Sequence, residues 1–266
     1  MENVEIEPKK ASNLRNWNLS MGFLHLVQGI VMIAISSEFS IPVVGNFLNF
    51  DVQTETLKPI AEKIFDLKIG PAVGAFLIMS AIAHFLVSTV LYNWYIKNLG
   101  KHINIARWVE YSFSSTLMLV IIAMLVGIYD LAALIGLAGL NASMILFGWM
   151  MELHNQTLRQ SSGQATKTNW TSFIFGCIAG VIPWIAVAIY LFAAGEGDFK
   201  APSFVYWIYF SIFLFFNTFA VNQVLQYKKI GKWKDYLYGE KAYIILSLVA
   251  KSLLAWQVFA GTLRPM

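Results

Sequence analysis

The stretch AYIILSLVAKSLLAWQVFAGTL, residues 242–263, decides how this chain folds. It is long enough to cross a bilayer, which takes roughly 20 apolar residues, and Lys251 is its only charged residue. A charge near the bilayer centre costs roughly 2.5–3.5 kcal/mol on insertion scales, so it persists where it is paired, neutralised or used covalently. A desolvated lysine is also the side chain that forms Schiff bases with carbonyl compounds. The remaining sequence must therefore supply a counter-charge and a pocket if Lys251 is functional.

The composition is that of a membrane protein. The 266 residues are 58% hydrophobic and 13% charged, whereas a soluble domain is about 25% charged. The net charge of +4 does not indicate nucleic-acid binding, because the basic residues lie in short loops between apolar segments, where they set topology. Cys177 is the only cysteine, so no disulfide can form within the chain. The polar first 16 residues do not resemble a signal peptide.

Seven apolar segments have spanning length, and we predict one all-α domain over residues 1–266 with seven transmembrane helices. The segments are 17–36, 71–96, 104–128, 131–151, 171–194, 203–227 and 242–263. The first connection, residues 37–70, is long. Within it IPVVGNFLNFDVQTE (41–55) alternates and contains a Gly-Asn pair, which predicts a small β-hairpin. LKPIAEKIFDLK (57–68) predicts a short amphipathic helix.

The distribution of lysine and arginine predicts the orientation in the membrane. Most of the 19 basic residues fall on the side that holds the N-terminus and the second, fourth and sixth connections. Positive charge is retained on the cytoplasmic side. We therefore expect a multi-pass cell-membrane protein with a cytoplasmic N-terminus, an extracellular C-terminus, and the residue 37–70 loop with its hairpin outside.

Few ionisable residues lie within the predicted spans: His25, His84, Arg107 at an edge, Glu110 and Lys251. At 1.5 Å per residue, His25, His84, Glu110 and Lys251 all fall in the cytoplasmic half. Ser247 shares a helix face with Lys251, and Ser80 shares one with His84, because each pair is four residues apart.

These residues also have structural interpretations. Lys251 can be a snorkelling or structurally paired lysine, or serve a transporter, and Glu110 can be a buried carboxylate bonded to Tyr111 or a serine. A single intramembrane histidine is more often packed than functional. Metal binding by His25, His84 and Glu110 has no supporting ligand spacing, so we expect no metal.

The outer halves of the predicted spans contain no Asp, Glu, His, Lys or Arg. Ion and proton pathways through membranes normally need ionisable groups along their length. The polar cluster therefore connects to one side only, which argues against a pump. The pairs Gly70/Gly74 and Gly176/Gly180 are typical of close helix packing.

The chain resembles the heliorhodopsins, microbial-type retinal proteins with inverted membrane topology. The resemblance covers nearly the whole chain, and it is carried by the span-7 lysine, the span-3 carboxylate, the long outer loop and five segments. The segments are RWVEYSFSS (107–115), NASMILFGW (141–149), FGCIAGVIPW (175–184), FLFFNTFA (213–220) and LSLVAKSLLAWQ (246–257).

The resemblance implies roles for individual residues. Lys251 would carry all-trans retinal covalently as a protonated Schiff base, with Glu110 as counterion. The hydrogen-bond network at that pair would comprise Ser80, Ser114, Ser247 and Tyr111. His25 and His84 would lie in a polar cavity on the cytoplasmic side and influence proton movement. The walls of the retinal pocket would be Asn141, Met144, Ile145, Trp184, Phe216 and Trp256.

The implied function is light sensing by a retinal-binding photoreceptor without net ion transport, and not an enzyme. Light would isomerise retinal from all-trans to 13-cis, the Schiff base would transiently lose its proton, and a slow photocycle would follow. The resemblance also implies a homodimer, and a cytoplasmic signalling partner would read the output. Two alternatives stay open: a light-driven or light-gated proton or ion transporter, and a non-retinal transporter or receptor built on the Lys251–Glu110 ion pair.

Overall fold

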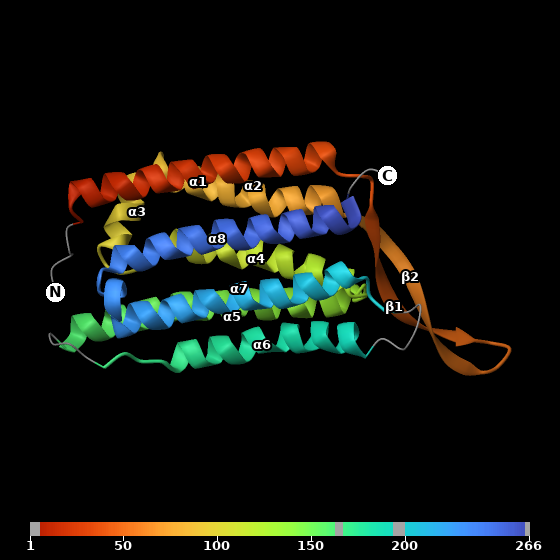
Figure 1. The fold of residues 1–266 in the computed structure, drawn as a ribbon. Coiled ribbons are helices and arrows are strands. Elements are labelled where there is room, and N and C mark those ends of the chain that lie inside the picture. The colour runs from red at the N-terminus through yellow and green to blue at the C-terminus, as the bar shows by residue number, and fades with distance from the viewer. Residues whose placement is uncertain (1–5, 163–166, 194–199, 264–266) are drawn as a thin grey trace.

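The computed structural model describes residues 6–162, 167–193 and 200–263. In this part of the chain, seven helices are long and apolar enough to cross a membrane, which confirms the seven predicted spans. They form one bundle in which successive spans alternate in direction (Figure 1). The spans are α1 (Pro8–Ile35), α2 (Ile69–Ser88), α4 (Ile105–Leu125), α5 (Leu131–Ser162), α6 (Thr171–Phe192), α7 (Ser203–Lys228) and α8 (Tyr236–Val258).

The bundle has two distinct ends. At the end where α1, α4, α6 and α8 begin, called the N-terminal end below, lie the short helices α3 (Tyr92–Leu99) and η1 (Gly231–Lys234) (Figure 1). At the opposite, hairpin end lie the strands β1 (Ser40–Asp51) and β2 (Thr56–Lys68), with the π-helical turn η2 (Phe259–Leu263) that ends α8. Both names describe position in the bundle.

The predicted hairpin is present, but it is larger than expected and turns elsewhere. Strands β1 and β2 pair antiparallel along their whole length, with a bulge between Val43 and Val44. The turn follows Asp51, whose Oδ1 accepts from the backbone N–H groups of Gln53 and Thr54. The Gly-Asn pair lies inside β1 instead. The helix predicted at residues 57–68 is wrong, because pairing with β1 overrides the local helical pattern and makes that segment β2.

The first two spans also differ from their predicted bounds. The polar segment before residue 17 is helical because it packs on the α2–α3 corner, where Leu14 is fully buried and Arg15 Nε donates to Ser88 O at 2.8 Å. The second span ends at Ser88 rather than at residue 96. Ser88 and Thr89 donate their hydroxyls to the carbonyls of residues 84 and 85, a local bonding pattern that bends or ends helices.

Glycines allow close packing of neighbouring helices. A Cβ added at Gly74 on α2 would collide with the Ile33 side chain of α1. A Cβ added at Gly180 on α6 would collide with the Met144 side chain of α5. Both positions thus act as the close-packing sites expected for small residues in membrane helices.

The main apolar core fills the bundle toward its hairpin end. It joins buried residues of α2, α4, α6, α7 and α8, among them Phe76, Met118, Trp184, Ile212 and Leu254. The polar residues buried in the bundle gather instead toward the N-terminal end. This separation places the candidate site between the apolar and the polar part of the bundle.

Candidate functional site

An ion pair between α4 and α8 forms the centre of the site. Lys251 Nζ donates to Glu110 Oε1 at 2.8 Å, and the two side chains are 4% and 9% exposed. Both residues lie within helices that are long and apolar enough to cross a membrane. The structure therefore brings together the lysine and the carboxylate that the sequence singles out, which lie 141 residues apart.

Two serines complete the hydrogen bonding of this pair. Ser80 on α2 donates to Glu110 Oε1 at 2.6 Å, and Lys251 Nζ lies 3.0 Å from Ser247 Oγ one turn earlier on α8. Ser114 is buried near Glu110, but its hydroxyl makes no hydrogen bond of ordinary geometry among the described residues. Of the two options for Glu110, the serine contact is the one observed.

Tyr111 lies at the pair and contacts it through its ring. Lys251 Nζ sits 5.1 Å from the centroid of the Tyr111 ring, a distance at which a cation is attracted to the ring face. The Tyr111 hydroxyl donates to the backbone carbonyl of Tyr243 at 2.9 Å and also interacts with the side chain of Ser247, the serine that contacts Lys251. Its place in the hydrogen-bond network of the pair stays a prediction.

The two intramembrane histidines stack on one another beside the pair. The ring centroids of His25 and His84 are 5.6 Å apart with an interplanar angle of 13°. His84 Nδ1 lies 2.8 Å from Asn18 Oδ1, whereas neither nitrogen of the fully buried His25 has a hydrogen-bond partner among the described residues. The sequence does not single out Asn18, which holds His84 in place.

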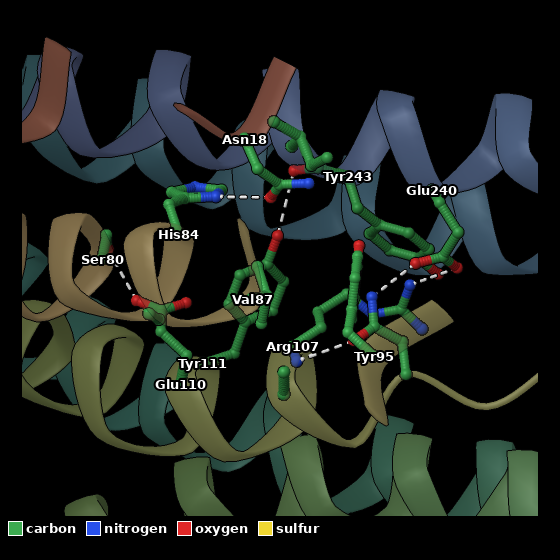
Figure 2. Close-up of a pocket in the computed structure, with 14 residues that line it drawn as sticks. Asn18, Ser80, His84, Val87, Tyr95, Arg107, Glu110, Tyr111, Glu240 and Tyr243 are labelled. Carbon is green, nitrogen blue, oxygen red and sulfur yellow. Dashed lines mark hydrogen bonds and ion pairs between the residues drawn. The ribbon is translucent and has the colours of Figure 1, made fainter. Parts of the chain in front are cut away.

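A cavity of about 40 Å³ runs from this pair toward the N-terminal end of the bundle (Figure 2). Glu110 and His84 lie at one part of its wall, and Arg107 and Glu240 lie at another. A water molecule needs roughly 10–15 Å³ of such space, so the cavity has room for a few waters. It links the ion pair to a second charged cluster.

The second cluster is a buried arginine held by two carboxylates, and we call it the Arg107 cluster. Arg107 Nη2 donates to Glu152 Oε1 and Arg107 Nη1 donates to Glu240 Oε1, both at 2.5 Å. Neither carboxylate side chain is more than 2% exposed. The guanidinium also lies over the rings of Trp108 and Tyr243, at 4.4 and 3.9 Å from their centroids.

The sequence interpretation missed both carboxylates of this cluster. The predicted spans end at residue 151 and begin at residue 242, whereas α5 continues to Ser162 and α8 begins at Tyr236. Glu152 and Glu240 therefore lie within helices rather than in loops. Arg107 at the edge of its span was the available signal, because a buried arginine requires carboxylate partners.

The predicted pocket walls lie mostly on the hairpin side of the pair. Trp184 is buried, and the rings of Tyr209, Phe213 and Phe216 surround it at centroid distances of 5.2–5.7 Å. Trp184 and Phe216 belong to the core that also contains Leu254, one turn beyond the lysine.

The α5 residues of the predicted wall face α4 and α6. Asn141 Nδ2 donates to Ser115 Oγ at 2.9 Å and to Thr116 Oγ1 at 3.0 Å. Met144 lies against Gly180, and Ile145 is half-buried beside it. These three residues thus stay compatible with a wall between α4, α5 and α6.

Trp256 is the predicted wall residue that the structure places elsewhere. Its side chain is 41% exposed, its Nε1 donates to Gln28 Oε1 at 3.1 Å, and its ring packs edge-on against Phe259. It lies five residues after Lys251, and at 100° per residue that spacing turns it toward the outside of the bundle. We therefore do not include it in the pocket.

The spans carry no charge on the hairpin side of the pair. No Asp, Glu, His, Lys or Arg occurs in the described helical segments 26–35, 69–79, 111–125, 131–151, 171–192, 203–227 and 252–263. All the charged and imidazole groups of the site thus lie at the level of the pair or nearer the N-terminal end.

His102 lies at the N-terminal end of the bundle, near the Arg107 cluster. Its protonation makes the stability of the protein depend on pH. Its ring stacks on Tyr236 at 4.4 Å. Burial lowers the pKa of His102 from 6.5 to about 4, and the nearby positive charges of Arg159 and Lys229 add to this effect. The negative charge of Glu240 acts in the opposite direction and raises the pKa. Between these values the unfolded chain binds more protons than the folded one, so stability falls as pH falls through this window.

We expect His102→Asn to weaken this pH dependence. Asparagine tolerates the left-handed backbone of this position, where φ is 58°. The unfolding temperature should drop less between roughly pH 7 and pH 5 in the variant than in the parent protein. Equal drops in both proteins would contradict the assignment to His102.

The chain matches a known protein family over most of its length. The family model described as Heliorhodopsin matches residues 14–263. No curated protein matches the chain.

Proposed function

This chain belongs to the heliorhodopsin family, and from that premise we propose that it senses light without net ion transport, through retinal bound to Lys251. The family consists of retinal-binding membrane photoreceptors of the rhodopsin type rather than typical enzymes. The observation that carries the proposal is the buried Lys251–Glu110 pair, which lies between an apolar half-bundle and a small cavity that Glu110, His84, Arg107 and Glu240 line.

The residues present suit a covalently bound retinal. Lys251 offers a buried amine with a carboxylate and a hydroxyl at hydrogen-bond distance, which favours a protonated nitrogen. Trp184 and its surrounding rings supply the apolar surface that a polyene requires. Retinal, when bound as a protonated Schiff base in the all-trans form, would supply visible absorption and light-driven isomerisation to 13-cis.

The chain's own residues would control the proton of this linkage. We propose that Glu110 balances the positive charge on the Lys251 nitrogen and that Ser80 and Ser247 hold the two groups in line. His84, fixed by Asn18, and His25 would polarise the cavity through which the proton moves transiently. His84 lines the cavity on the N-terminal side of the pair, so polar neighbours for the proton lie away from the apolar half.

The absence of charged groups on the hairpin side in the described spans supports a photoreceptor that does not pump. A proton leaving the pair has polar neighbours toward the N-terminal end alone, and it would return the way it came. A slow repacking of the helices would then be the signal. A cytoplasmic partner, or the second subunit of a homodimer, would detect it. We propose a cytoplasmic N-terminal end, because most basic residues of the connections lie there.

Light-induced pH change across a vesicle membrane tests the absence of transport. The retinal-loaded protein in sealed lipid vesicles is expected to give no net pH change under continuous light, although its visible band responds to each flash. A proton uncoupler should make no difference. A sustained light-dependent pH change that the uncoupler removes would support the transporter alternative instead.

A further inference from the structure

The Arg107 cluster is a buried site with an unbalanced charge. With all three groups ionised, two carboxylates face one guanidinium, so the cluster has one net negative charge inside the protein. The groups packed against it are tyrosines and amides, together with the His102–Tyr236 stack, and the cations Arg159 and Lys229 lie near His102. A buried net negative charge is costly, and taking up one proton would remove it.

Glu240 is the carboxylate of the cluster that meets the cavity. It lines the same space as Glu110 and His84, as Figure 2 shows, whereas Glu152 does not line it. Arg107 Nε is buried and has no hydrogen-bond partner among the described residues, which suits a water molecule in this cavity. A few waters there would connect the two carboxylates by a hydrogen-bonded path.

The two carboxylates differ in how many hydrogen bonds their Oε2 atoms accept. Glu152 Oε2 accepts from the backbone N–H of Asn104 and from the indole of Trp108, and both donors are fixed. Glu240 Oε2 accepts one hydrogen bond, from the side-chain amide of Asn104, and that amide is held in place because its Oδ1 accepts from the backbone N–H of Arg107. A carboxylate oxygen has two acceptor positions, so a proton can bind Glu240 Oε2 without breaking a hydrogen bond, whereas both positions of Glu152 Oε2 are occupied.

We infer that Glu240 holds the proton that leaves the Lys251–Glu110 pair after light absorption; this rests on the proposed function. The N–H bond at the Lys251 nitrogen breaks and leaves its electron pair on nitrogen, and the proton bonds to a Glu240 carboxylate oxygen. Glu110 stays ionised, the nitrogen becomes neutral, and the cluster changes from one net negative charge to none. Because the cluster is nearly inaccessible to solvent, the proton is stored and returns rather than escaping.

Infrared difference spectroscopy of the full-length, retinal-loaded protein in lipid tests this inference. A carboxylic-acid C=O band should appear with the loss of visible absorption and be absent in Glu240→Gln. In Glu152→Gln the band should stay at its frequency with smaller amplitude, because the cluster has lost its net negative charge. Glu62→Gln, on the exposed hairpin, should leave it unchanged. A band that survives in Glu240→Gln, or that Glu152→Gln alone removes, overturns the inference.

Glu240→Asp keeps the test decisive if the glutamine variant does not fold. The shorter side chain changes the hydrogen bonding of the carboxyl group, so the C=O band should persist at a different frequency. An unchanged frequency would rule out Glu240. A wild-type protein that has no visible band with retinal would contradict the proposed function instead, which separates the two failures.

Discussion

Lys251→Ala is expected to abolish visible absorption completely, whatever the amount of retinal supplied. Among the described residues, Lys251 is the only buried lysine, so no other amine can form the covalent linkage within the bundle. The measurement is the visible spectrum of the purified variant expressed with all-trans retinal. A surviving band would remove Lys251 as the attachment site.

Two further variants separate loss of the linkage from loss of the fold. Lys251→Ala leaves Glu110 as a buried unpaired carboxylate, and breaking such a pair costs about 3–5 kcal/mol. The double variant Lys251→Ala/Glu110→Gln removes both charges, so it should fold more stably and still lack the band. Lys97→Ala, at an exposed position on α3, should keep the full visible band.

Glu110→Gln is expected to shift the absorption to the red and to increase the fraction of protein whose linkage is deprotonated at neutral pH. The carboxylate lies 2.8 Å from the Lys251 nitrogen, and a pair at about 4 Å interacts by about 4 kcal/mol at an effective dielectric constant near 20. The negative charge stabilises the positive nitrogen in the ground state. Removing it narrows the optical gap and moves the visible band to longer wavelength.

The glutamine variant keeps the shape of the side chain, so the spectral change reports charge. A pH titration of the visible band in Glu110→Gln and in the parent protein measures both effects. Glu62→Gln on the hairpin should titrate like the parent. An unchanged spectrum and titration in Glu110→Gln would show that another group is the counterion.

Helix number and the central pair could be predicted because membrane physics restricts the possibilities. Seven apolar segments have to become helices, since lipid offers no partners for free backbone groups. Lys251 and Glu110 sit in such segments at matching depth, and an intramembrane charge needs a partner. The same reasoning places His25 and His84 beside them.

What the sequence did not reveal depends on contacts between distant segments. Strand β2 has a helical pattern locally, and its pairing with β1 decides its conformation. Glu152 and Glu240 lie just outside apolar runs, and only the packing of α4, α5 and α8 shows that both meet Arg107. Trp256 shares a helix with Lys251, but its direction follows from how α8 is rotated against α1.

The visible spectrum of the detergent-solubilised wild-type protein, with and without all-trans retinal, tests the central claim most directly. We predict a visible band that requires retinal and that hydroxylamine bleaches in the light, because hydroxylamine attacks a Schiff base. Well-folded protein without such a band would contradict the photoreceptor assignment and leave Lys251 and Glu110 as a buried ion pair.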